Sequence, residues 1–121
     1  MRPDLDSPPV TEAARAEMEA FHSAVVEEVR RVVAAHDVVV VGMAWNQPVK
    51  QARAALDGAG VAHHYHEIGN YLGMWRERLA VKLWSGWPTF PMVFVKGTLV
   101  GGASTTRRAL EDGSLQAMLK G

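Results

Sequence analysis

The chain of 121 residues contains no cysteine. This absence excludes disulfide bonds, thiolate metal ligands and catalysis by a thiol of the protein itself. The sequence also has no run of about 18 or more apolar residues, and its first residues lack the apolar segment of a signal peptide. We therefore predict no membrane span and expect a cytoplasmic protein.

An excess of charge of either sign is also missing. Thirteen lysines and arginines balance thirteen aspartates and glutamates, which gives a formal net charge of zero. Without a basic excess, neither nucleic acid nor an anionic membrane is an expected partner. The length fits one domain, which we place at residues 11–121. Residues 1–10, rich in proline and aspartate, are predicted to be a frayed tail.

What the sequence does contain is an alternation of helical and extended patterns. Thr11 can cap a stretch rich in alanine and glutamate that predicts one helix up to His36, with an apolar face made of Met18, Phe21, Val25, Val29 and Val32. The four valines at 38–41 are typical of a strand covered on both faces. Further helices are predicted at 48–56, 71–84 and 105–119, the last interrupted near 112–113, and further strands at 61–68, 92–95 and 98–100.

This order of elements predicts an α/β fold. The early strands alternate with helices, which implies right-handed parallel crossovers, whereas Lys96-Gly97 joins the last two strands as a hairpin. The expected architecture is thioredoxin-like, with a four-stranded mixed β-sheet flanked by helices and an extra N-terminal helix.

Three ordered motifs relate the chain to a known family. They are Trp87-Pro-Thr-Phe-Pro91, then Phe94-Val-Lys-Gly97 leading to Gly101-Gly102, and finally Leu110-Glu-Asp-Gly-Ser-Leu115. From about Val38 to its end the chain resembles the monothiol glutaredoxins. The resemblance implies a thioredoxin-like fold, binding of glutathione and a role in cell redox homeostasis that depends on a cysteine.

The active-site signature of that family falls on Asn46-Gln47-Pro48-Val49, so Asn46 stands where the family has its nucleophile. One interpretation is that Asn46 only caps the following helix, because asparagine is among the best N-cap residues. The other is that Asn46 donates to a ligand, because the positive end of a helix favours an anion. Trp45, beside it, is expected at the rim, where it could shape a ligand slot or a protein-contact patch.

The resemblance also assigns residues to a glutathione groove. Pro91 matches the cis-proline of the family, and the backbone of Phe90 would pair with the cysteinyl unit of glutathione. The amides after Gly101-Gly102 would hold the γ-glutamyl carboxylate; the groove residues there are Gly102, Ala103 and Ser104. Ser104 replaces an aspartate of the family and is alternatively a helix N-cap.

Two cations and one apolar residue complete the predicted groove. Arg78 and Lys82 lie four residues apart on one helix, at positions that the resemblance puts near the glycine carboxylate of glutathione. The alternative for both is a solvated basic face. Met92 replaces a glutamine of the family and is expected at the rim, together with Trp45.

Other chemistry-bearing residues have simpler interpretations. His63, His64 and His66 suggest a metal site, but alternation along a strand separates His63 from the other two, so we predict a half-exposed strand and no metal site. Trp75 and Trp84 are expected to pack from a helix face into the protein.

Three functions stay open at this point. A non-catalytic protein that binds glutathione, a glutathionylated protein or another protein partner is the one we favour, because the groove motifs are present and the cysteine is not. The thiol of bound glutathione could instead support redox chemistry or iron–sulfur-cluster handling, although half the thiolates for a [2Fe–2S] cluster would be missing. The resemblance also implies a BolA-like protein as a structural or regulatory partner.

Overall fold

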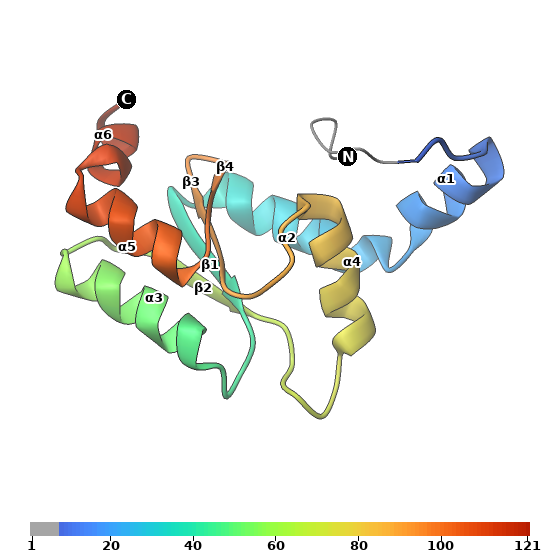
Figure 1. Ribbon diagram of the computed structural model, residues 1–121, viewed down its shortest axis with the longest axis horizontal. Helices are drawn as coiled ribbons and strands as arrows, with labels where there is room; N and C mark the ends of the chain where they lie inside the picture. The colour runs from blue at the N-terminus through green and yellow to red at the C-terminus, as the bar shows by residue number, and fades with distance from the viewer. Residues whose placement is uncertain (1–7) are drawn as a thin grey trace.

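The computed structural model describes residues 8–121, and four strands in it form one mixed sheet. The strands are β1 (Val38–Gly42), β2 (His64–Glu67), β3 (Met92–Val95) and β4 (Thr98–Gly101), in the spatial order β2-β1-β3-β4 (Figure 1). β1 runs parallel to β2 and antiparallel to β3, and β3 and β4 form the predicted hairpin. The predicted thioredoxin-like architecture is confirmed.

Helices cover both faces of this sheet. The helices are α1 (Glu12–Ala20), α2 (Ser23–Ala35), α3 (Gln47–Gly58), α4 (Trp75–Ser85), α5 (Ala103–Glu111) and α6 (Ser114–Lys120). Figure 1 shows α2 and α4 on one face and α3, α5 and α6 on the other. The interruption predicted near 112–113 is the junction of α5 and α6.

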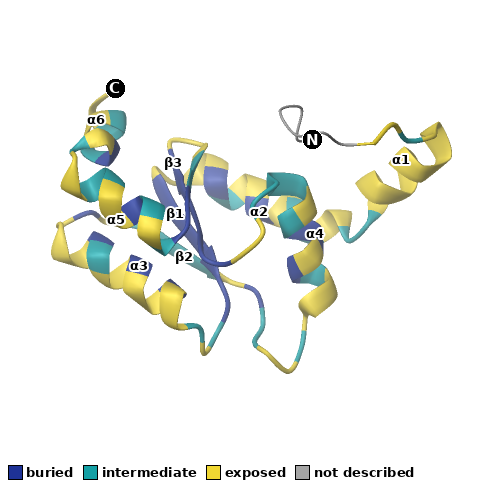
Figure 2. Ribbon diagram, viewed as in Figure 1, coloured by how far each residue is buried: buried dark blue, intermediate teal, exposed yellow. Residues whose placement is uncertain are grey.

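The sheet separates two apolar cores, and β1 contributes to both. Val39 and Val41 pack with residues of α2 and α4, whereas Val38 and Val40 pack with α3 and α6. Every residue of β1 is buried, which Figure 2 shows as a dark centre to the molecule. This confirms the prediction of a strand covered on both faces, because successive side chains of a strand point to opposite sides.

The single helix predicted at 11–36 is wrong, because the chain breaks at Phe21-His22. His22 has a left-handed backbone (φ 44°), which ends the regular hydrogen bonding of α1 and starts α2. Thr11 does cap α1, accepting from the amide of Ala14 at 3.1 Å. Met18 is 57% exposed and no residue of α1 is buried, so Met18 does not belong to the core. The apolar face of the predicted helix is used only in α2, which packs against α4 and the sheet.

The helix predicted at 71–84 begins later, at Trp75. Residues 69–74 form a loop in which Asn70 and Gly73 make a β-bridge, and Met74 enters α4 with a left-handed backbone (φ 61°). Trp75 is therefore 60% exposed on the first turn of α4, and its predicted packing is wrong. Trp84 packs as predicted, with its ring 5.8 Å from that of Phe94.

Of the predicted frayed tail, residues 1–7 lie outside the described part of the chain, and Pro8 to Val10 belong to no helix or strand. The extended segment predicted at 61–68 is regular only at His64–Glu67, and the first three residues of this strand are half-buried, as expected for an edge strand.

The edge strand also carries a pH-sensitive contact. The rings of His36, at the end of α2, and His64 are stacked 4.1 Å apart. Burial, followed by the proximity of His36 and His66, lowers the pKa of His64 below its ordinary value of 6.5. The His64 imidazole is therefore protonated at a higher pH in the unfolded chain than in the folded chain. The free energy of unfolding accordingly falls as the pH drops below 6.5 towards the lower pKa of the folded state.

We accordingly expect a lower melting temperature at acidic than at neutral pH, and a smaller difference between the two in a His64→Gln variant, which cannot gain that charge. Differential scanning calorimetry of both proteins measures the effect. An identical pH dependence in the variant would show that the stacked pair does not contribute.

Candidate functional site

The predicted site residues come from three segments that leave the sheet at the same edge. Val41 at the end of β1 pairs with Met92 at the start of β3, and Val93 pairs with Gly101 at the end of β4. The loop after β1, the turn before β3 and the glycines after β4 therefore meet at one edge, at the bottom of the sheet in Figure 1. Helices α3 and α5 begin at this edge.

Asn46 caps α3. Its Oδ1 accepts a hydrogen bond from the amide of Val49 at 2.9 Å, and Pro48 occupies the first turn, which confirms the capping prediction. Its Nδ2 donates to the hydroxyl of Tyr71 at 3.1 Å. Trp45 precedes it with a left-handed backbone and stands 62% exposed beside the helix end. Both the oxygen and the nitrogen of the Asn46 side-chain amide are thus hydrogen-bonded within the protein.

The turn before β3 has the predicted cis bond between Phe90 and Pro91. Phe90 is buried, and the Lys82 ammonium lies 5.7 Å from the centroid of its ring, so the fold brings these two predicted groove residues together. Met92 is fully buried, and its sulfur accepts from the Ser85 hydroxyl at 3.3 Å. Its assignment to the rim is wrong, because the first residue of a central strand points its side chain into the core.

The N-terminus of α5 follows the two glycines directly. Gly101 has φ 127°, and a β-carbon there would come within 3.1 Å of the Trp87 ring and collide with Thr105. Gly102 is the N-cap, its amide donating to the Thr105 hydroxyl at 2.8 Å, so the alternative that Ser104 caps the helix is wrong.

Ala103 and Ser104 then occupy the first turn of α5. First-turn amides have no carbonyl partner within their own helix, and the dipole adds positive potential at that end. The two residues therefore offer a pair of donors suited to a carboxylate.

Arg78 is held inside the protein. Only 8% of it is exposed, and its Nη1 donates to the carbonyls of Ile68, at 3.1 Å, and Gly73, at 2.7 Å. The solvated basic face is therefore wrong for Arg78, which ties the 69–74 loop to α4. Its contact with a ligand carboxylate stays a prediction.

A surface hollow of about 300 Å³ includes Trp45 and Asn46 and continues between α3 and β2. The Arg53 guanidinium lies there 4.1 Å above the Tyr65 ring, and the Tyr65 hydroxyl donates to Glu67 at 2.9 Å. Burial, followed by the hydrogen bond to Glu67, raises the pKa of Tyr65 far above its ordinary value and keeps the phenol protonated. Of the predicted site residues, this hollow brings together only Trp45 and Asn46.

In the described residues 8–121 no group of three or more His, Asp or Glu side chains is placed to hold an ion. His63 lies 3.7 Å from Asp57, and His64 stacks on His36. An iron–sulfur cluster needs thiolate ligands, and with no cysteine in the chain the residues present do not fit one.

Sequence reasoning missed Tyr71 and Thr105. Tyr71 stands at the start of the helix predicted at 71–84, so nothing in the sequence marks it as a neighbour of Asn46. Thr105 stands three residues after the Gly102 N-cap, where a side-chain acceptor for the cap amide is commonly found, and that spacing is a signal that the sequence does contain.

Within the described residues 8–121, no helix is both long and apolar enough to cross a bilayer.

The mixed sheet, the cis-proline turn before β3 and the two helix N-termini at one edge define a thioredoxin-fold protein that has no thiol at this edge. The chain belongs to the glutaredoxin family. The family profile described as Glutaredoxin matches residues 48–100. A glutaredoxin-like protein of Dictyostelium discoideum is 44% identical over 100 residues, which cover 83% of this chain and 81% of that protein.

A shorter sequence match agrees with this assignment, and solved structures at lower identity share the fold. A probable monothiol glutaredoxin 2 of Rickettsia felis is 46% identical over 41 residues, 34% of this chain and 39% of that protein. The solution structure of reduced glutaredoxin C1 from Populus tremula x tremuloides matches with a TM-score of 0.74 at 19% identity, covering 86% of this chain and 89% of that one. A buckwheat glutaredoxin–glutathione complex matches with a TM-score of 0.72 at 21% identity, covering 84% and 93%. These structures share the fold.

Proposed function

We propose that this protein binds glutathione, free or attached to a protein, and that it does so without a catalytic thiol of its own. The observation that carries the proposal is the set of backbone groups at one edge of the sheet. The cis turn at Phe90-Pro91 and the first-turn amides of Ala103 and Ser104 do not depend on the missing cysteine. A site built from backbone survives the loss of a side chain.

Each part of glutathione has a chemically suitable neighbour at this edge. The γ-glutamyl carboxylate suits the amides of Ala103 and Ser104, and the backbone of the cysteinyl unit suits that of Phe90. Lys82, next to Phe90, supplies a positive charge for the glycine carboxylate. Bound glutathione would bring to the N-terminus of α3 the thiol that the chain lacks.

Two features of the site are expected to weaken this binding. Ser104 is neutral and offers the ligand ammonium only a hydroxyl, not a charge. The Asn46 amide group already contacts Tyr71 and Val49, so it is not free to receive the cysteinyl unit without rearrangement. The buckwheat relative is described in complex with glutathione, and its shared fold supports an equivalent position here.

Titration of the isotope-labelled full chain with reduced glutathione tests the proposal by amide NMR. Saturable shifts are expected at Asn46, Phe90, Ala103 and Ser104. An Ala103→Pro variant should lower the affinity about tenfold, because it deletes one donor to a carboxylate at a helix position that accepts proline.

The matched control is Glu12→Pro, which places proline at the same first position of α1, away from the proposed site. This variant should bind glutathione like the parent protein. A flat titration of the parent, or equal binding by the Ala103→Pro variant, would contradict the proposed site.

A further inference from the structure

Helix α4 exposes a continuous apolar stripe. Trp75, Leu79 and Leu83 are 60%, 37% and 48% exposed with all described residues in place, and they follow one another at intervals of four residues. Single exposed apolar residues are ordinary, but three on one helix face make a contiguous patch, which marks an interaction surface. Helical geometry places Arg76 and Lys82 on the two flanks of this stripe.

Helix α1, in contrast, buries none of its residues against the rest of the protein. It has nine residues, none of them buried, and isolated helices shorter than about 12–15 residues are marginal in water. Figures 1 and 2 show it standing away from the sheet with an exposed surface. Ala14 and Met18 lie on one face, four residues apart, and Met18 is 57% exposed.

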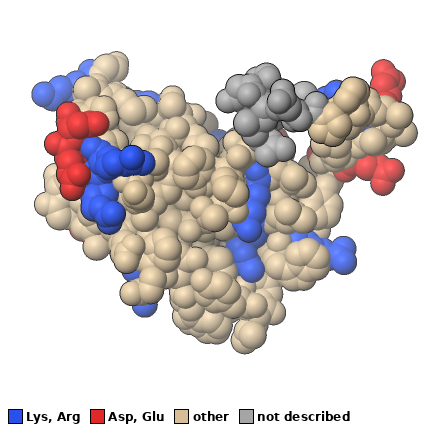
Figure 3. All heavy atoms as spheres, in the orientation of Figure 1, with Lys and Arg blue, Asp and Glu red and all other residues tan. Residues whose placement is uncertain are grey.

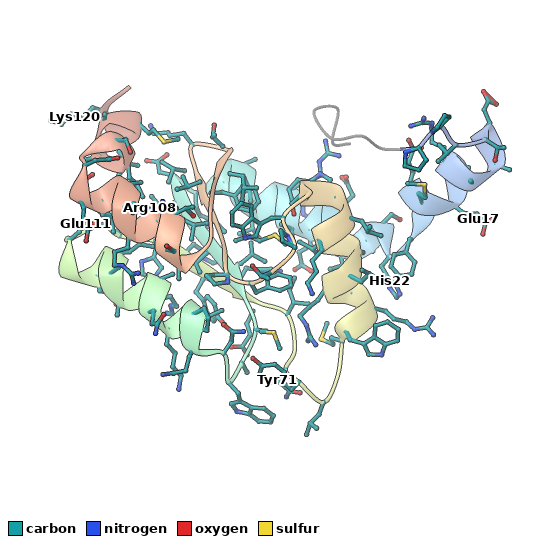
Figure 4. The ribbon with its side chains drawn as sticks, viewed as in Figure 1. Glu17, His22, Tyr71, Arg108, Glu111 and Lys120 are labelled. Carbon is teal, nitrogen blue, oxygen red and sulfur yellow. The ribbon has the colours of Figure 1, made fainter. Side chains whose placement is uncertain are left out.

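The charges of the two helices are complementary. α1 contains Glu12, Glu17 and Glu19 against Arg15, which leaves two negative charges in excess. Figure 3 shows acidic groups on its surface, and in Figure 4 Glu17 projects from α1 into open space. The flanks of the α4 stripe carry the positive charges of Arg76 and Lys82.

The backbone at the junction between α1 and α2 sets the direction in which α1 leaves the body of the chain. His22 has a left-handed backbone, and its ring packs edge-on against Phe21 with centroids 4.7 Å apart. In this conformation α1 points away from the body of its own chain (Figure 1), and the stripe on its own α4 stays exposed.

We propose that α1 of a second copy of this chain covers the α4 stripe, reciprocally, in a two-fold symmetric dimer. Met18 and Ala14 of one copy pack against Leu79 and its neighbours on the other, and Glu17 lies near Arg76. A reciprocal exchange of one helix closes on itself and leaves no free copy of either surface. Apart from Lys82, which flanks the stripe and also lies next to Phe90, the dimer involves none of the groups proposed to hold glutathione.

Sedimentation velocity of the full chain over a range of concentrations, up to roughly 100 µM, tests the dimer. The parent protein should approach twice the monomer mass. Leu79→Glu on α4 and Met18→Glu on α1 should each weaken the dimer at least about tenfold, because each puts a charge into the apolar contact. Leu72→Glu, an exposed leucine in the 69–74 loop, is the matched control and should leave the mass unchanged.

Mixing the two disruptive variants identifies the contacting partners. The Leu79→Glu chain has an intact α1 and the Met18→Glu chain an intact α4, so the mixture forms one good interface and should dimerise more tightly than either variant alone. Circular dichroism establishes that each variant is folded.

Three results would overturn the proposal. A parent protein that stays monomeric at all concentrations excludes the exchange. In that case α1 folds back on its own α4, or the stripe binds another partner such as lipid vesicles. A dimer that both variants leave intact uses another surface. A mixture no tighter than its components shows that α1 does not contact α4 of the second copy.

Discussion

Replacing Asn46 with cysteine should give this protein a reactive thiol. The side chain at this position reaches the amide of Val49 in the first turn of α3, so a sulfur there lies where orphan amides and the helix dipole stabilise a thiolate. The pKa of the introduced thiol should therefore fall below the ordinary value of about 8.5. The chain would acquire the nucleophile that it lacks without any change of fold.

The gain should appear in the rate of alkylation. Iodoacetamide should modify the Asn46→Cys variant at neutral pH about fivefold to tenfold faster than a Gln51→Cys variant, whose thiol lies on the exposed surface of the same helix. The pH dependence of the rate gives the thiol pKa. The loss of the cap should cost about 1 kcal/mol of stability, which urea denaturation of both variants measures.

A rate equal to that of the control would have two explanations: either Tyr71 covers the helix end, or α3 does not activate a thiol at this position. The Tyr71 hydroxyl lies 3.1 Å from the Asn46 amide nitrogen, and its ring belongs to the 69–74 loop. Combining Asn46→Cys with Tyr71→Ala separates the two explanations. If removal of the ring restores the rate, the helix end is active but covered; if the rate stays low, α3 does not activate a thiol at this position.

The sheet could be predicted from the sequence because each strand has a strong local pattern. The valine run of β1 is buried on both sides, and the Lys96-Gly97 turn fixes the β3–β4 hairpin. The break at Phe21-His22 could not be predicted, because the apolar spacing continues through it and no glycine or proline marks the left-handed His22. The start of α4 differs from the prediction although Gly73 lies just before it, because Met74 takes a left-handed backbone that its residue type does not predict.

At the candidate site, too, the features that depend on local sequence could be predicted, whereas those that depend on contacts between distant segments could not. Asn46, Pro91 and Gly102 act through the backbone or through a local cap, and their places follow from nearby sequence. Contacts between distant segments were not visible. Tyr71 reaches Asn46 across 25 residues, and Arg78 is buried by a loop whose path depends on its own hydrogen bonds. The family motif predicts a rim position for Met92, but a motif gives the position of a residue and not the direction of its side chain.

The last prediction concerns Arg78, for which the structure supplies a role that the sequence did not. Its guanidinium donates to the carbonyls of Ile68 and Gly73 in a buried setting, so replacement by methionine leaves both acceptors without their charged donor. Arg78→Met should lower the free energy of unfolding by about 2–4 kcal/mol. Arg31→Met, an exposed change on α2, should stay within about 0.5 kcal/mol of the parent protein.

Urea denaturation of both variants, followed by glutathione titration of the folded proteins, separates two roles of Arg78. If Arg78 only positions the loop, stability falls and the amides at 69–74 shift, while the shifts at Ala103 and Ser104 on adding glutathione persist. If Arg78 contacts the ligand carboxylate, as the family resemblance implies, glutathione affinity falls at an almost unchanged stability. The buried geometry favours the first outcome, because a guanidinium already held by two carbonyls has less freedom to turn towards a ligand.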